Sequence, residues 1–225
     1  MGNRAATRPS RFGGASLPLK VAVVGAAVAL STGAGLVAYF VSGLSLPIGI
    51  GLALVVSATV GIVVWRRLDP PTRAVARRRA WVGLWAGIAA TVAYDVTRFA
   101  VVAIFGLHVR PYAAIPLFGQ LLIDVPADTR AALVVGLLYH VANGTCFAIA
   151  YTLLAGTRGV VAGIVFALVL EAFMLTFYPG WLNVQAIGEF FSMTILGHVA
   201  YGATLGGLSR RLLASPPPAT SEVAP

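Results

Sequence analysis

The sequence predicts an all-α protein, a polytopic transmembrane helix bundle of about six spans. Its 225 residues are 59% hydrophobic and only 10% charged, whereas roughly 25% of the residues in a soluble domain are charged. A helix needs about 20 mostly apolar residues to cross a bilayer. Runs of this kind cover residues 21–41, 47–65, 81–106, 131–155, 159–178 and 187–208.

The last four runs predict a parallel internal repeat of two helix pairs. The first helix of each pair carries two small residues and an acid, spaced four apart: Gly87, Thr91 and Asp95, then Gly163, Ala167 and Glu171. The second helix carries a repeated motif: His140-Val141-Ala142-Asn143-Gly144, then His198-Val199-Ala200-Tyr201-Gly202. One run separates the two acid helices, so they have the same direction and an axis along the membrane normal relates the halves.

The repeat divides the chain into six segments. These are a basic N-terminal segment (1–20), a two-span packing unit (21–65), a basic cytoplasmic loop (66–80), repeat 1 (81–156), repeat 2 (157–209) and a cytoplasmic tail (210–225). Repeat 1 has an outer insertion, residues 107–130, in which three prolines surround an apolar stretch. This insertion fits a re-entrant or interfacial cap over the site, and it fits an idle loop equally well.

Basic residues predict the orientation, because Lys and Arg concentrate in short cytoplasmic loops. One side of the membrane has most of them: Arg4, Arg8, Arg11, Lys20, Arg66, Arg67, Arg73, Arg77, Arg78, Arg79, Arg158, Arg210 and Arg211. The other side has only Arg110 and Arg130. We therefore expect both termini in the cytoplasm and the chain in a bacterial cytoplasmic membrane. The net charge of +9 then indicates contact with anionic lipid. Nucleic acid is not an expected partner, because no aromatic stacking platform accompanies the arginines.

The first two runs contain small residues at every fourth position and no ionisable residue. The two stripes are Gly25, Ala29 and Gly33, then Gly49, Ala53, Ser57 and Gly61. Such stripes let helices approach closely in lipid. We expect these runs to be a scaffold, or a contact with a membrane partner such as a second copy of the chain.

Similar stripes carry the histidines of the repeat. The glycines expected at helix contacts are Gly87, Gly136, Gly144, Gly163, Gly202 and Gly206. Residues four apart share a helix face, so His140 and His198 are expected to point toward neighbouring helices. A rise of 1.5 Å per residue places both acids and both histidines between the midplane and the outer third of a hydrocarbon core about 30 Å thick.

Ionisable side chains in hydrocarbon are costly and mark candidate functional sites. The candidate residues here are Asp95, Arg98, His140, Asn143, Glu171 and His198. We expect one buried polar cluster in which the two histidines face each other. Two simpler interpretations remain open. Arg98 lies three residues after Asp95 and fits a local ion pair, and either histidine fits a hydrogen bond that only joins two helices.

The His-x3-Gly stripe, followed by aromatic and small residues as in Phe147 to Tyr151, resembles bacterial multi-pass membrane families that are named only as domains of unknown function. The resemblance covers residues 81–208. It implies no activity, cofactor or catalytic residue.

Three functions fit the sequence. The first is a transporter or channel in which the acid and histidine side chains line a proton or ion path. The second is a structural or assembly subunit of a membrane complex. The third is a metal or haem protein with His140 and His198 as ligands, although no permanent cofactor is expected. An enzyme is less expected, because the chain has no Gly-rich phosphate loop, Cys-x-x-Cys or His-Glu-x-x-His motif.

Overall fold

The structure is a computed structural model that describes residues 17–215. Within this range every secondary-structure element is a helix, which confirms the predicted all-α class. In chain order its helices are α1 (Leu19–Ala29), α2 (Ser31–Ser42), α3 (Leu46–Arg67), α4 (Pro70–Phe105), α5 (Ala114–Ile123), α6 (Arg130–Leu154), α7 (Val160–Trp181) and α8 (Ile187–Ala214).

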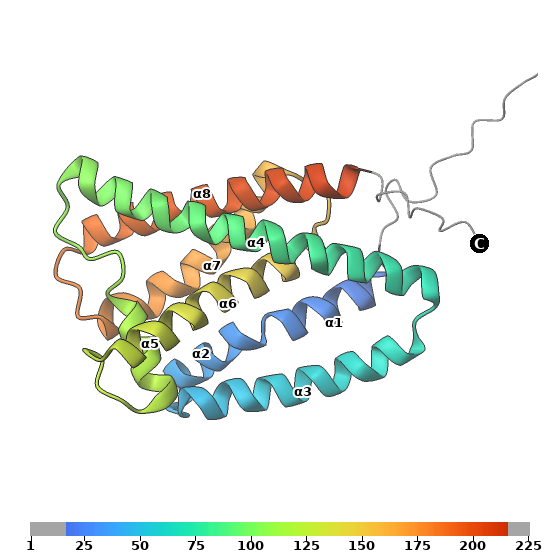
Figure 1. The fold of residues 1–225 in the computed structure, drawn as a ribbon, viewed down its shortest axis with the longest axis horizontal. Helices are drawn as coiled ribbons and strands as arrows, with labels where there is room; N and C mark the ends of the chain where they lie inside the picture. The colour runs from blue at the N-terminus through green and yellow to red at the C-terminus, as the bar shows by residue number, and fades with distance from the viewer. Residues whose placement is uncertain (1–16, 216–225) are drawn as a thin grey trace, which may run out of the picture.

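The long helices lie side by side along the longest axis of the molecule (Figure 1). α4 packs against α6 and α8, and α7 packs against α8. The short helix α5 packs against α6 at the end of the bundle opposite the α3–α4 turn. α4 therefore connects the two halves of the bundle, because it contacts one helix from each histidine motif.

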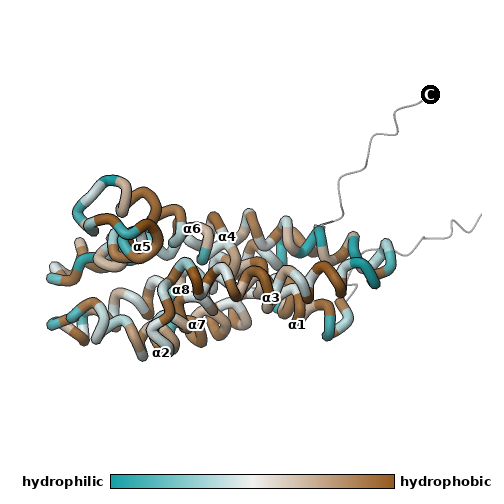
Figure 2. The backbone as a smooth tube through the Cα atoms, turned by 90° about the horizontal axis from the view of Figure 1, so that it is seen from below, coloured by the Kyte–Doolittle hydropathy of each residue, from teal (hydrophilic) through white to brown (hydrophobic). Residues whose placement is uncertain are grey.

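Several of these helices fit a membrane protein. Among the described residues, α3, α4, α6 and α7 are each long and apolar enough to cross a membrane, and α1 with α2 makes a fifth candidate if the bent pair is one span. Apolar residues dominate the length of the bundle, and hydrophilic residues gather toward its ends (Figure 2). α8 is also long, but it carries polar side chains that are buried inside the bundle, including Thr194, His198 and Ser209.

The first predicted run, 21–41, is broken in the structure. α1 and α2 meet at Leu30 with a bend of 60°. The Ser31 hydroxyl donates hydrogen bonds to the carbonyl oxygens of Val28 at 2.7 Å and Ala27 at 3.3 Å. Serine side chains that bond back to the preceding turn compete with the helical hydrogen bonds and bend helices. This local bonding at Ser31 gives a physical reason for the break.

The predicted basic loop, 66–80, is mostly helical, which corrects the sequence prediction. α4 begins at Pro70, because Asp69 caps it by accepting a hydrogen bond from the Thr72 amide at 2.7 Å. Prolines in the first turn favour a helix start, where no amide partner is needed. Arginine side chains of this segment donate to carbonyl oxygens at the ends of other helices: Arg73 to Arg66, Arg78 to Leu212 and Leu213, and Arg79 to Leu153. Cations at helix C-termini also complement the helix dipole.

All six glycines predicted at helix contacts lie where an added Cβ atom would meet a neighbouring element. Gly87 and Gly144 lie between α4 and α6, and Gly136 lies against the backbone of α5. Gly163 lies against Gly202 and Gly206, so the backbones of α7 and α8 touch. These contacts hold the helices that carry the acids close to the helices that carry the histidines.

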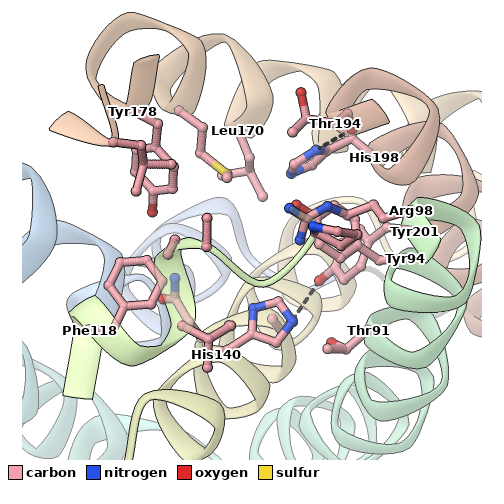
Figure 3. Close-up of a pocket in the computed structure, with 18 of the residues that line it drawn as sticks. Thr91, Tyr94, Arg98, Phe118, His140, Leu170, Tyr178, Thr194, His198 and Tyr201 are labelled. Carbon is pink, nitrogen blue, oxygen red and sulfur yellow. Dashed lines mark hydrogen bonds between the residues drawn. The ribbon is translucent and has the colours of Figure 1, made fainter. Parts of the chain in front are cut away.

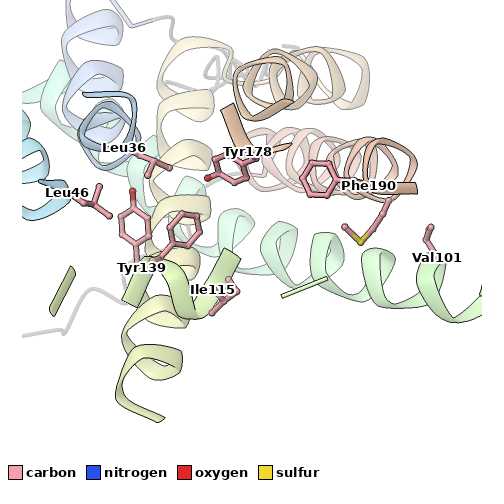
Figure 4. Packing of buried hydrophobic residues seen from close by; sticks show 9 residues of the cluster. Leu36, Leu46, Val101, Ile115, Tyr139, Tyr178 and Phe190 are labelled. Atoms are coloured by element: carbon pink, nitrogen blue, oxygen red, sulfur yellow. The ribbon is translucent and has the colours of Figure 1, made fainter. Parts of the chain in front are cut away.

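A hydrophobic core fills the end of the bundle near α5 (Figure 4). Its buried members come from the seven helices α2 to α8 and include Leu36, Leu46, Ile115, Tyr139 and Tyr178. Aromatic contacts connect α2 to α7 here, because the Phe40 and Phe177 rings are stacked with their centroids 5.3 Å apart. The candidate site lies beside this core and shares Ile115, Tyr139 and Tyr178 with it.

Candidate functional site

The acid and the histidine of the first half contact each other. Asp95 on α4 and His140 on α6 approach through the close α4–α6 contact at Gly87 and Gly144. His140 Nε2 lies 3.1 Å from Asp95 Oδ1 and 3.2 Å from Oδ2. Both side chains are largely buried, with exposed fractions of 16% and 15%. The pair is therefore a hydrogen-bonded acid and base with limited access to solvent.

The second half repeats this pairing with deeper burial. His198 Nδ1 on α8 lies 2.8 Å from Glu171 Oε2 on α7 and 3.0 Å from the carbonyl oxygen of Thr194. Only the contact to Thr194 has hydrogen-bond geometry, so we assign the Nδ1 proton to it (Figure 3). Neither oxygen of the Glu171 carboxyl accepts a hydrogen bond, and the side chain is almost completely buried. A buried carboxyl group without hydrogen bonds is costly, and His198 Nδ1 lies within ion-pair distance of it.

Tyr94 on α4 contacts both histidines, which corrects the expectation that the histidines face each other directly. Its ring centroid lies 5.9 Å from that of His140 and 4.8 Å from that of His198. Tyr94 is the residue immediately before Asp95 and is itself buried. Its ring thus connects the two acid–histidine pairs at the centre of the bundle.

Arg98 is not a partner of Asp95. Among the described residues, no ion pair joins Arg98 to a carboxylate. Its guanidinium lies over the Tyr94 ring, 4.9 Å from the centroid, and its Nε atom is buried without a hydrogen-bond partner. Only 7% of the residue is exposed. The local ion pair considered from the sequence is therefore wrong, and among the described residues Arg98 is a buried cation with no carboxylate within ion-pair distance.

The site contains a cavity of about 80 Å³. His140, His198 and Arg98 line it, together with hydroxyl groups from four helices (Figure 3). The outer insertion forms one wall, because Arg110 and the first half of α5 also line the cavity. The insertion therefore packs on the bundle through the contact of α5 with α6 and contributes residues to the cavity wall. The cavity has charged and hydroxyl side chains among mainly apolar ones, and this segment covers one side of it; we call it the polar cavity because of those charged groups.

Asn143 has a different role from the other predicted site residues. Its Oδ1 atom accepts a hydrogen bond from the Thr32 hydroxyl at 2.8 Å, which connects α6 to α2. Asn143 also lines the polar cavity and a second, apolar groove beside it. It therefore marks the boundary between two differently lined spaces.

The sequence prediction missed several residues that line the cavity, among them Tyr94, Arg110, Thr194 and Tyr201. Tyr201 donates a hydrogen bond to the carbonyl oxygen of Gly144 and so connects α8 to α6. Tyr201 occupies the position in the second histidine motif that Asn143 occupies in the first. This equivalence could have identified Tyr201 from the sequence. Tyr94 was recognisable only as the neighbour of Asp95.

The described residues contain no cluster of side chains that could hold a metal ion. Within residues 17–215, no group of three or more His, Cys, Asp or Glu side chains lies close enough together to hold a metal ion. The single cysteine, Cys146, is half-buried on α6 and is a free thiol.

The fold and the site together define an all-helical protein with several membrane-type helices and two buried acid–histidine pairs. The chain belongs to DUF6789, a family of unknown function, which matches residues 77–220. The match spans α4 to α8 and so includes every residue of both pairs, whereas α1 to α3 lie outside it. Comparisons with curated proteins and with solved structures gave no match.

Proposed function

We propose that the chain is a six-span protein of a bacterial cytoplasmic membrane, built from a two-span unit and two parallel halves. The bent pair α1–α2 and the long helix α8 complete the six spans. α8 supports this proposal because it lies along α4 and α7, which are themselves long and apolar enough to cross a membrane. Its lower hydropathy comes partly from polar residues that face inward and never meet lipid.

Both termini lie in the cytoplasm in this proposal. The predicted cytoplasmic arginines support it, because several of them gather at the end of the bundle where α3, α6 and α8 end. Arg66, Arg67 and Arg77 belong to the same basic segment and are positioned to contact anionic headgroups.

The protein moves protons across this membrane, with the two acid–histidine pairs as the groups that take up and release them. One observation carries this proposal: each half pairs its own acid with its own histidine, and both histidines line one cavity. Histidine exchanges protons near neutral pH, and chains of acids and histidines carry protons in pumps and transporters. Arg98 argues against a metal cation as cargo, because its positive charge would repel one inside the cavity.

Two irregular segments beside the cavity and the adjoining groove support a transport role. The α1–α2 pair is a discontinuous helix whose break at Leu30 lines the apolar groove, and the non-helical segment 107–113 contributes Arg110 and Pro111 to the cavity wall. Non-helical backbone at membrane depth occurs where protein buries it or where it lines a cavity. Discontinuous helices commonly form the binding sites of transporters.

Proton flux in liposomes tests this proposal. Purified protein is reconstituted into vesicles that contain a pH-sensitive dye, a pH gradient is imposed, and potassium with valinomycin compensates the charge. We expect wild-type protein to dissipate the gradient faster than empty vesicles. Glu171→Gln removes an almost completely buried carboxyl group of the site and should reduce the protein-dependent rate at least tenfold.

The matched control is Glu189→Gln, which makes the same chemical change at the outer end of α8, outside the cavity. This variant should retain the wild-type rate, and both variants should elute as folded protein in size-exclusion chromatography. An unchanged rate in Glu171→Gln, or no flux in the wild type, would contradict proton movement. The acid–histidine pairs would then be bonds that hold a structural membrane subunit together.

A further inference from the structure

We propose that the polar cavity and the adjoining apolar groove bind one single-chain carboxylate amphiphile of the fatty-acid type. Its carboxylate binds Arg98, and its chain lies in the groove between α2 and α7. The inference goes beyond the proposed function and does not depend on it, because it assigns a ligand to the same cavity.

The first argument is the unsatisfied charge of Arg98. Arg98 is more than nine-tenths buried as a residue, lines the cavity, and has no carboxylate within ion-pair distance among the described residues. A buried unpaired charge is strongly unfavourable, so an anion that enters the cavity gains binding free energy from it. The planar guanidinium forms two parallel hydrogen bonds with a carboxylate, which makes this head group a better match than a neutral one.

The cavity that Arg98 lines contains a second cation. Arg110 adds positive charge to the cavity wall, and the two arginines together favour an anionic head group. Asp95 and Glu171 do not line the cavity, and each lies within ion-pair distance of a histidine nitrogen. The volume of about 80 Å³ suits a carboxylate and is small for the glycerophosphate head of a membrane phospholipid.

The second argument is the groove next to this cavity. Its volume is about 250 Å³, and its walls are almost entirely apolar side chains of α2, α6 and α7. It shares Asn143, Phe147, Leu170, Met174 and Tyr178 with the polar cavity, so the two spaces adjoin. An apolar cavity of about 150 Å³ holds benzene, and by proportion this groove holds a chain of about ten carbon atoms.

The groove also has an entrance from the side. Val37 and Phe173 line it and are 38% and 57% exposed on the apolar surface of the bundle. At its outer end, Phe40 packs against Phe177 and Trp181, and these rings close the space between α2 and α7. A chain dissolved in the bilayer can therefore enter between α2 and α7 and bring its head group to Arg98.

Equilibrium binding of radiolabelled decanoate tests the inference. Protein is placed in nanodiscs of phosphatidylcholine, and empty nanodiscs measure the non-saturable partition of decanoate into lipid. We expect one saturable site per chain. Unlabelled decanoate should compete for this site. Decanol, which has the same chain and no charge, should compete at least tenfold less well. Equal competition by decanol, or no saturable binding, would overturn the proposal.

Three variants locate the site. Arg98→Gln should weaken decanoate binding at least tenfold, and Arg130→Gln, at the exposed outer end of α6, should leave it unchanged. Ala34→Trp fills the groove and leaves Arg98 unchanged, and it should weaken binding at least threefold. This variant keeps the test decisive if Arg98→Gln does not fold. Wild-type affinity in folded Arg98→Gln or Ala34→Trp would overturn the site.

The assay uses no pH gradient and is therefore independent of transport. Loss of saturable binding with intact proton flux would overturn this inference and leave the proposed function standing. Saturable binding without proton flux would overturn the proposed function and leave the site standing.

Discussion

At the scale of single residues, Asp69 decides where the longest helix begins. Its carboxylate accepts hydrogen bonds from the amide and the hydroxyl of Thr72, just before two prolines. Both hydrogen bonds hold the pKa of the Asp69 carboxyl below its ordinary value of 3.8, and the bond from the Thr72 amide has the larger effect. The ionised carboxylate therefore stabilises the folded protein, and this contribution is complete above the ordinary pKa.

Asp69→Ala should lower the unfolding temperature at pH 7, because the first turn of α4 loses its cap. The wild-type advantage should shrink as the pH falls below about 3.8, since protonation of Asp69 in the folded state removes the same interaction. Thermal unfolding in detergent at pH 7 and pH 3 measures both differences. Asp69→Asn is the control, because asparagine caps helices without a charge. An Asp69→Ala deficit that is equal at both pH values would contradict this account.

The same scale shows how much of the site the sequence predicts. Asp95, Glu171, His140 and His198 stand out because they are ionisable residues in apolar runs that repeat in register. Their partners do not follow from the sequence, since pairing depends on how each helix is rotated about its axis. The position of Arg98 shows this limit: spacing alone suggests a bond to Asp95, whereas the guanidinium lies over Tyr94.

At the scale of elements, α5 depends on two glycines. Gly119 lies against the backbone of Ala132, and Gly136 lies against the backbone of Ile115. These mutual contacts let α5 and α6 approach to backbone distance, which places the insertion over the cavity. The exposed His108 adds a second attachment, because its amide donates to Glu189 at the start of α8 at 2.6 Å.

Gly119→Ala should destabilise the protein by about 1–3 kcal/mol, the usual cost of overpacking, because the added Cβ meets backbone that cannot rotate away. Gly51→Ala is the matched control, since a Cβ there has open space around it, and surface changes usually stay within about 0.5 kcal/mol. Denaturant titration in mixed micelles measures both free energies of unfolding. Equal effects of the two substitutions would show that α5 does not pack on α6 at Gly119.

Element boundaries illustrate what sequence patterns miss. Hydropathy locates the long helices well, because apolar runs of this length have few alternatives. It does not detect the break at Leu30, where the run stays apolar and the cause is the side chain of Ser31. It also treats arginines as loop residues, whereas in α4 they extend the helix and donate to the ends of its neighbours.

At the scale of the whole molecule, α4 to α8 enclose the site and α1 to α3 lie to one side of it. α3 is the most peripheral helix, and most of its apolar side chains are exposed. Contact of this unit with lipid, or with a second copy of the chain, remains a prediction from its small-residue stripes. The unit nevertheless contributes to the binding region, because α2 forms one wall of the apolar groove.

The central claim is that each half of the molecule closes its own acid–histidine pair beside one shared cavity. The chain has three histidines, and each lies within ion-pair distance of a different carboxylate: His108 with Glu189, His140 with Asp95, and His198 with Glu171. Neutralising one carboxylate should therefore change the environment of one imidazole far more than that of the other two.

Side-chain nitrogen NMR of histidine-labelled protein in nanodiscs measures this directly, with the three signals assigned by single His→Gln variants. We predict that Asp95→Asn has its largest effect on the His140 signal, Glu171→Gln on His198, and Glu189→Gln, as the exposed control, on His108. If Asp95→Asn shifts His198 as much as His140, or if Glu171→Gln leaves His198 unchanged, the pairing within each half is contradicted.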